Sequence, residues 1–241
     1  MKFPLLFRRL LFRRRSVVLP TPVGWLLILV VIGLIVGFLF RNMAVFLTVN
    51  EPVGAEYLVI ESWMDKAELD QGLAYFAAND FKKVVIVGGP ISNDFHGIDS
   101  NYAERAAVYL QRQGLAEEKT IIVKVPYSAQ ARTFLNGVMV REWFERKGIT
   151  ATRLDVFSSG VHTRRSRDLY QQAFGEDVAI GIIASRPHNF DPEHWWRTSG
   201  SGKGVAVEFA AWFLIKCCFD PGDPGSHLEK WGVEKTTSSN D

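Results

Sequence analysis

The residues best suited to chemistry gather in one short stretch, which reads SSGVHTRRS from position 158 to 166. It places His162, Arg164 and Arg165 around the first turn of an expected helix. Free backbone N–H groups at a helix N-terminus attract anions, whereas cationic side chains are unfavourable beside the positive end of the helix dipole. An anion bound between the backbone N–H groups and the cationic side chains would explain why basic residues occur at this helix N-terminus. The stretch therefore predicts a site for a phosphate or a carboxylate, with Ser159, Arg164 and Arg165 as ligands.

His162 is the candidate catalytic residue of this stretch, because histidine titrates near neutral pH and acts as a general acid or base. The alternative is that the basic residues form a solvated face. We favour that alternative for Arg167, since Asp168 or Glu176 is available to pair with it.

Other polar or small residues follow the remaining expected strands. They are Glu61, Gly88, Gly89, Arg132 and Thr133. Parallel strands present their carboxyl ends at one edge of a sheet, where ligands bind, so these residues are expected to lie near His162. Paired glycines permit close approach of a ligand to the backbone, and Arg132 is able to hold an anion bidentately. Glu61 is expected to orient His162 or to activate water.

The motifs of several common sites are absent from the sequence. It contains no GxGxxG or Walker pattern, no GxSxG elbow, no HExxH and no CxxC, so no dinucleotide, ATP, serine-hydrolase or zinc site is indicated. His188, Asp191 and His194 share a polar loop and are the alternative for a metal, which we do not expect; no cofactor is indicated. Trp195-Trp196 is open to three interpretations: stacking on a sugar, contact with a membrane surface, or packing against the core.

The elements that must position these residues alternate between strand and helix. Mostly apolar runs of four to six residues occupy 57–60, 84–87, 120–125, 154–157 and 178–183. Such runs, separated by helical stretches, predict a parallel sheet covered on both faces. The predicted fold is therefore α/β, a three-layer, Rossmann-like domain with a mainly parallel five-stranded sheet.

Two segments follow the last expected strand. Residues 204–219 are almost entirely apolar but short for a membrane span and interrupted by Glu208, so we expect a closing helix buried on the sheet. Residues 220–241 are rich in Pro, Gly, Ser and Thr and are expected to form a flexible tail. Cys217 and Cys218 are adjacent, and because neighbours seldom bridge with good geometry, both are expected as buried small hydrophobes.

The N-terminal segment predicts a membrane anchor. Residues 23–40 are uncharged, and 18 helical residues span roughly 27 Å, close to the hydrocarbon thickness of a bilayer. A cleaved signal peptide is the alternative, but its apolar region is shorter and ends at a small-residue site, whereas Arg-Asn-Met follows here. We expect a basic cytoplasmic N-terminus over 1–22, a transmembrane helix over 23–41, a linker over 42–54 and the α/β domain over 55–219.

The distribution of charge along the chain predicts the orientation of the anchor in the membrane and argues against nucleic acid as a partner. Before residue 50 the chain carries seven basic residues and no acid, and six of them precede the apolar run, so the N-terminus is expected to stay in the cytoplasm. The domain is then expected in the periplasm or another extracytoplasmic space. Residues 51–241 carry 21 basic and 26 acidic residues. The pI of 8.5 therefore belongs to the anchor, and nucleic acid is not expected as a partner.

The same residues resemble the YdcF/SanA/ElyC-like family of bacterial proteins, over about 55–219. Gly88-Gly89 matches the Gly-Gly that ends the second strand of the family. The segment 162–165, His-Thr-Arg-Arg, matches its His-x-x-Arg after the fourth strand. Glu104 matches a glutamate near the start of the helix after the second strand.

A further segment of the family typically reads Asn-Thr-x-Glu-Asn, of which this chain keeps Thr133 and Asn136 but has Leu135 in place of the Glu. A second departure is the end of the first strand, where 61–63, Glu-Ser-Trp, replaces a glycine-containing turn. The arginine usual in the first helix is also missing. These departures indicate a divergent branch of the family.

The resemblance implies a role in the bacterial cell envelope, linked to peptidoglycan or its lipid carrier. It adds Glu104 to the catalytic candidates and Asn136 to the ligand-binding ones. One soluble member is associated with S-adenosylmethionine, which is not normally supplied outside the cytoplasm and is not expected here. We therefore expect an inner-membrane envelope factor that binds and processes an anionic small molecule or lipid-linked intermediate. The alternative is a non-catalytic scaffold or regulator that binds a membrane partner protein.

Overall fold

The computed structural model describes residues 19–91, 101–128, 131–230 and 232–233 of the 241-residue chain. Most of the predicted basic N-terminus, residues 1–18, lies outside the described residues. The chain divides into two units, residues 1–41 and 42–241, and each is described by itself.

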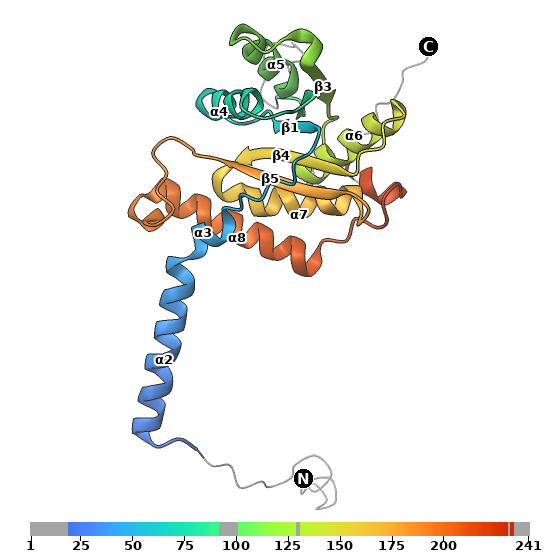
Figure 1. The fold of residues 1–241 in the computed structure, drawn as a ribbon. Helices are drawn as coiled ribbons and strands as arrows, with labels where there is room; N and C mark the ends of the chain where they lie inside the picture. The colour runs from blue at the N-terminus through green and yellow to red at the C-terminus, as the bar shows by residue number, and fades with distance from the viewer. Residues whose placement is uncertain (1–18, 92–100, 129–130, 231, 234–241) are drawn as a thin grey trace, which may run out of the picture. The chain divides into compact units, whose positions relative to one another are not determined.

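The first unit is built on α2 (Pro22–Arg41), a helix of 20 residues (Figure 1). It begins at a proline, which is tolerated there because the first turn of a helix needs no backbone N–H donor. None of its residues is buried. At 1.5 Å per residue the helix is about 30 Å long, which is the thickness of the hydrocarbon core of a bilayer. Helix α2 is therefore long and apolar enough to cross a membrane, in the region predicted for the anchor.

The second unit contains a five-stranded sheet in which all strands are parallel, in the order β3-β2-β1-β4-β5. The strands are β1 (Tyr57–Glu61), β2 (Lys83–Gly88), β3 (Thr120–Lys124), β4 (Arg153–Ser159) and β5 (Ala179–Ser185). Each coincides closely with one of the predicted apolar runs. The predicted α/β class with a five-stranded parallel sheet is thus confirmed.

Helices cover both faces of this sheet (Figure 1). They are α4 (Lys66–Ala77), α5 (Tyr102–Arg112), α6 (Arg132–Arg146) and α7 (Thr163–Phe174). Alternate residues of a strand point to opposite faces. In β1, Val59 therefore joins the core under α6 and α7, whereas Leu58 and Ile60 join the core under α4 and α5. Burial on both faces explains why strands such as β1 and β2 read as continuous apolar runs rather than alternating ones.

The strand order reverses direction between β1 and β4. From β1 the chain winds outward through β2 to β3, then returns to the other side of β1 for β4 and β5. The register pairs Ile60 with Phe157, so Glu61, the last residue of β1, lies beside Ser158 near the end of β4. In open α/β sheets such a reversal leaves a crevice at the carboxyl ends of the two strands, and ligands bind in it.

Residues 42–54, which were predicted as a linker, are packed into the domain. They begin with the short helix α3 (Met43–Leu47), whose Ala44 and Leu47 are fully buried. The backbone N–H groups of Val53 and Ala55 each donate to the buried Asp155 carboxylate at 2.8 Å. These contacts fix the segment to the domain.

The apolar segment after β5 forms α8 (Ser199–Cys218), and the prediction that it is buried on the sheet is wrong. The helix packs on α3 and α7 at the side of the domain, and Val205 is its one buried residue. Trp195, in the short turn η3 (Trp195–Arg197), is 4% exposed and belongs to the same small core as α3, as expected from the packing interpretation. Sequence hydropathy did not distinguish a helix buried on all sides from one that exposes an apolar face.

Two other predictions for the C-terminal region are also wrong. Cys217 and Cys218 are exposed and are joined as a vicinal disulfide, rather than buried. The described part of the tail is packed: Glu229, in the turn η4 (His227–Lys230), is 6% exposed and forms two 2.6 Å hydrogen bonds with Arg141 of α6. Arg141 is itself buried, and its need for a carboxylate partner explains why the tail is held there. Residues 231 and 234–241 of the predicted tail lie outside the described part of the chain.

Candidate active site

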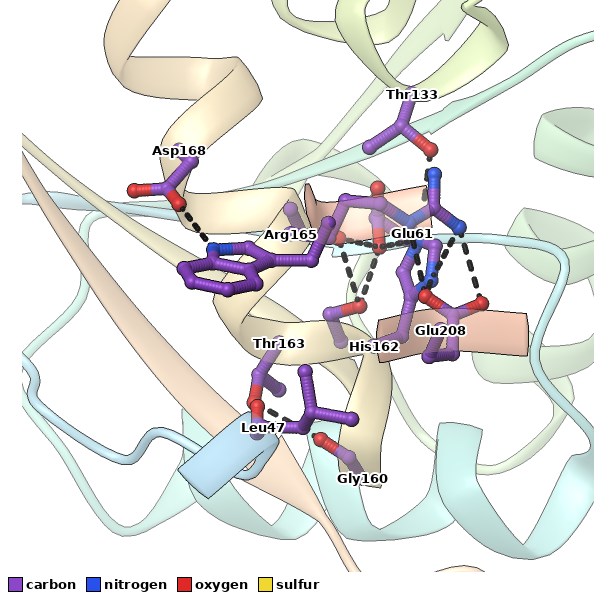
Figure 2. Close-up of polar contacts among 12 residues, drawn as sticks. Leu47, Glu61, Thr133, Gly160, His162, Thr163, Arg165, Asp168 and Glu208 are labelled. Atoms are coloured by element: carbon purple, nitrogen blue, oxygen red, sulfur yellow. Dashed lines mark hydrogen bonds and ion pairs between the residues drawn. The ribbon is translucent and has the colours of Figure 1, made fainter. Parts of the chain in front are cut away.

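A histidine and a glutamate from different elements meet at the crevice between β1 and β4 (Figure 2). His162 ends the short 3-10 turn η2 (Gly160–His162), which follows β4 directly. Glu208 belongs to α8. Nδ1 of His162 lies 3.0 Å from Oε2 of Glu208. The turn that places His162 requires glycine at 160, where φ is +25° and a Cβ would lie 3.1 Å from Pro187.

Arg165, on the first turn of α7, holds the same glutamate with two hydrogen bonds. Its Nε donates to Oε2 of Glu208 at 2.8 Å, and its Nη2 donates to Oε1 at 3.0 Å. Burial alone would raise the pKa of the Glu208 carboxyl, but hydrogen bonds from His162 and Arg165 outweigh it and lower this pKa to about 2. Glu208 is therefore an ionised carboxylate near neutral pH, and Arg165 balances its charge.

The Glu208 carboxylate determines the tautomer of His162. A carboxylate only accepts hydrogen bonds, so the 3.0 Å contact requires a proton on Nδ1 of the ring. Arg165 Nη2 also approaches Nδ1 to 2.9 Å, but a protonated ring nitrogen has no lone pair to accept from it. We therefore assign the neutral ring as Nδ1–H, with the lone pair on Nε2. A histidine held in this way accepts a proton at Nε2, and the carboxylate then stabilises the imidazolium.

The Nε2 side of His162 faces a buried polar group of residues. Thr133 Oγ1, at the start of α6, lies 3.4 Å from Nε2, and Oε2 of Glu61 lies 4.0 Å from it. The Trp63 ring packs edge-on against the imidazole, with centroids 5.1 Å apart and an interplanar angle of 77°. These contacts restrict the ring while leaving its lone pair directed at groups able to relay a proton.

Glu61 is the second carboxylate of the site, and it is completely buried. Its Oε2 accepts a short hydrogen bond from Ser158 Oγ and a second, at 3.0 Å, from Ser166 Oγ. Its Oε1 has no hydrogen-bond partner among the described residues. Burying a carboxylate oxygen without a donor is costly, so this orphaned oxygen is suited to accept a hydrogen bond from a water molecule or a ligand. Burial, reinforced by the charge of Glu61, raises the pKa of the nearby Tyr170 hydroxyl well above its usual range.

A cavity of about 350 Å³ opens beside His162. The residues that line it include Trp63, Ser159, His162, Lys203, Val207 and Glu208. Gly200 and Gly204, on the first turns of α8, also line it, and a Cβ at either position would meet no atom within 4 Å. Packing therefore does not require these glycines, whereas close approach of a ligand to the helix backbone would.

The N-terminus of α6 adds a second feature to the site. Its N-cap residue, Ala131, has φ of 38° and ψ of 47°, a left-handed conformation that alanine rarely adopts, and it makes no side-chain cap. Strained backbone concentrates at functional sites, and an uncapped helix N-terminus attracts anions. Arg132 is exposed at this end, and Asn136 lies one turn after Thr133, on the same face of the helix.

Several predicted site residues have other contacts in the structure. A Cβ at Gly88 would lie 2.0 Å from Ser62 Oγ, so this glycine makes room for the serine, and Gly89 accepts a hydrogen bond from Tyr102 N. Glu104 pairs with Lys124 and lines a separate hollow over α5.

Arg164 donates to the carbonyl of Phe46 and stacks over its ring, 3.9 Å from the centroid. Burial lowers the pKa of the Arg164 guanidinium. Arg164 thus anchors α3, and its role as a ligand stays a prediction. Arg167 lies on the solvated face, as expected, but its partner is Glu51, at 2.6 Å, rather than Asp168 or Glu176.

Glu208 and Lys203 are the candidate functional residues that sequence reasoning missed, and Glu208 is the more informative of the two. The sequence shows it as the one acid within 204–219, and that isolation served as an argument against a membrane span. The same isolation was the available signal of a site, because a carboxylate in an apolar helix needs a partner. Its partner could not be found from spacing, since His162 precedes it by 46 residues.

The described residues include no group of three or more His, Cys, Asp or Glu side chains arranged to hold a metal ion. In the loop that was considered for a metal, His194 instead pairs with Asp191 at 2.8 Å. No protein-family model matches the chain, and no curated protein matches it in a sequence search. The resemblance to the YdcF/SanA/ElyC-like family therefore stays a prediction.

Proposed function

We propose that this protein is a single-pass membrane protein whose α/β domain processes an anionic molecule of the bacterial cell envelope, outside the cytoplasm. The substrate is phosphorylated or carboxylated and related to peptidoglycan or its lipid carrier, and the reaction is a hydrolysis or a group transfer. The observation that carries the proposal is the hydrogen-bonded pair of Glu208 and His162 beside an open cavity at the crevice of the sheet.

The proposed mechanism uses His162 as the general base. Nε2 takes the proton of a water molecule or an acceptor hydroxyl as that oxygen attacks the substrate, and Glu208 stabilises the imidazolium that forms. The proton then passes from Nε2 to the leaving oxygen. Arg165 fixes Glu208 through its two hydrogen bonds, so it acts as a positioning residue rather than as a ligand of the anion.

The anionic group of the substrate is held from two sides in this proposal. Lys203 lines the cavity and supplies a positive charge. Arg132 and the uncapped N-terminus of α6 supply a second charge and free backbone N–H donors. Glu61 lies beyond Nε2, where it accepts a hydrogen bond from the attacking group through its orphaned oxygen.

The test uses the full chain, purified in detergent and incubated with undecaprenyl phosphate, undecaprenyl diphosphate or muropeptides. Products are followed by mass spectrometry. General base catalysis contributes about 10² to 10⁴ in rate, so His162→Ala is expected to lower turnover by at least about 10². Val108→Ala, an exposed position on α5, serves as the control. If the His162→Ala variant turned over the substrate as fast as wild type, the proposed mechanism would be excluded.

The second candidate is a non-catalytic scaffold or regulator, and the exposed apolar face of α8 favours it. Under this alternative none of the three substrate classes is turned over, and a membrane protein co-purifies with the chain. A third outcome is that one of these molecules raises the thermal stability of wild type but not of His162→Ala, without being turned over. The cavity would then bind this molecule without catalysis.

A further inference from the structure

Helix α8 carries apolar side chains around its whole circumference. One face packs on the domain through Val205, Phe209 and Trp212. The opposite face is exposed and consists of Ala206, Val207, Ala210, Phe213, Leu214 and Cys217. These positions recur at intervals of three and four, so they form one stripe along the helix, which we call the α8 stripe. Its three largest members, Val207, Phe213 and Leu214, are 55%, 56% and 58% exposed.

The α8 stripe is uninterrupted by charge. The stripe spans 12 helical residues, from Ala206 to Cys217, a length of about 17 Å. The charged residues within this part of α8 turn away from the stripe, since Glu208 binds His162 and Lys216 pairs with Asp168. A helix that is apolar all round is normally buried, either in a protein core or in a membrane. The domain supplies a core for one face of α8, and the stripe requires a second apolar environment.

Chain connectivity shows which apolar environment is near. Helix α2 ends at Arg41 and α3 begins at Met43, so a single residue, Asn42, joins the two helices in the chain. Helix α3 is packed on α8: Ala44 and Leu47 share a core with Val205. The Phe46 ring meets the Trp212 ring edge-on, with centroids 4.9 Å apart. The helix that bears the stripe is thus fixed to the segment that directly follows the apolar helix.

We propose that the α8 stripe docks on the bilayer that α2 crosses, with its apolar side chains at the boundary between headgroups and acyl chains. A helix lying in this plane buries one apolar face at the boundary of headgroups and acyl chains, while the other apolar face of α8 stays packed on the domain. The inference rests on the proposed membrane span of α2. It also has a consequence for the site: Val207 belongs both to the stripe and to the wall of the cavity, so docking brings the mouth of the cavity to the level of the lipid headgroups.

The experiment uses the full chain reconstituted in vesicles of phosphatidylethanolamine and phosphatidylglycerol. In a Cys217→Ser, Cys218→Ser background, a single nitroxide label is attached at Val207→Cys, Leu214→Cys or Val108→Cys. Val108 is the matched control, because it is also a valine on a helix surface and is 47% exposed. Oxygen concentrates in the acyl region and a nickel chelate stays in water, so the ratio of their collision rates with the label reports depth.

The expected result is an oxygen-to-nickel ratio several-fold higher at 207 and 214 than at 108. Equal ratios at all three positions would overturn the proposal. Labels at 207 and 214 that are shielded from both reagents would also overturn it, because they would show the stripe covered by a second copy of the chain. Failure of the span itself is distinguishable, since the chain would then be released from the vesicles by alkaline carbonate.

Discussion

Glu208 and His162 form a hydrogen bond of 3.0 Å although 46 residues separate them in the chain. One belongs to a helix at the side of the domain and the other to the turn after β4. Their contact defines the reactive end of the histidine, because the Nδ1–H group donates a hydrogen bond to Glu208 and the lone pair is therefore on Nε2. Most of the chemistry proposed for this protein depends on this relationship.

Removing the charge of Glu208 is expected to impair turnover while preserving the fold. Glu208→Gln keeps the shape of the side chain, but its amide is also able to donate a hydrogen bond and so to favour the wrong tautomer of His162. Comparable changes in catalytic triads lower the rate by about 10⁴, so we expect a loss of at least about 10² in kcat with little change in KM. Glu118→Gln, at an exposed position, is the control. Equal kcat values for the two variants would contradict the role of Glu208.

The same residue predicts a specific dependence of stability on pH. The pKa of the Glu208 carboxyl is about 2 in the folded chain, against an ordinary value of 4.5. Because the folded pKa is depressed, the stabilisation is complete above about pH 4.5 and is lost as the pH falls toward 2. The difference in unfolding free energy between wild type and Glu208→Gln is therefore expected to shrink across this window. If the difference in unfolding free energy between the two proteins stayed constant from pH 5 to pH 2, the contacts with His162 and Arg165 would not be lowering the pKa of Glu208.

The sheet was predictable because its signal is local. Strands such as β2 are buried on both faces, so a continuous apolar run such as 84–87 marks them without knowledge of their neighbours. The edge strand β3 leaves Ile122 exposed on one face. The position of His162 was predictable for a related reason, since any residue that directly follows β4 lies at the carboxyl edge of the sheet. The reversal of strand order between β1 and β4 then brings Glu61 beside it.

The rest of the site depends on contacts that no local pattern encodes. Glu208 reaches His162 only because α8 packs on α3 and α7, and an apolar segment does not show which of its faces is covered. Arg164 was expected at an anion, but its guanidinium lies over the Phe46 ring, a contact with a segment predicted as a linker. Arg141 gave no signal at all, because an arginine on a helix is normally solvated.

The buried ion pair of Arg141 and Glu229 is expected to be important for stability. The two side chains are 10% and 3% exposed, and removing one member of a buried pair leaves an uncompensated charge. Glu229→Ala is therefore expected to destabilise the chain by about 3 to 5 kcal/mol, measured by denaturant unfolding in detergent. Glu145→Ala removes a second partner of the same arginine, at 3.3 Å, but Glu145 is 63% exposed, so its loss is expected to cost less than about 1 kcal/mol. Similar costs for both variants would contradict this explanation.

Gly88 offers a way to separate packing from ligand binding at the end of β2. A Cβ at this position would lie 2.0 Å from Ser62 Oγ, so Gly88→Ala is expected to destabilise the chain by about 1 to 3 kcal/mol through overpacking. Combining it with Ser62→Ala removes that hydroxyl and is expected to restore part of the stability, since the remaining neighbours of the Cβ, on Tyr102 and Ala103, are no closer than 3.1 Å. Thermal unfolding of the two single variants and the double variant measures this coupling. If Gly88→Ala were as stable as wild type but lost turnover, the glycine would instead serve the approach of a ligand, as the sequence first indicated.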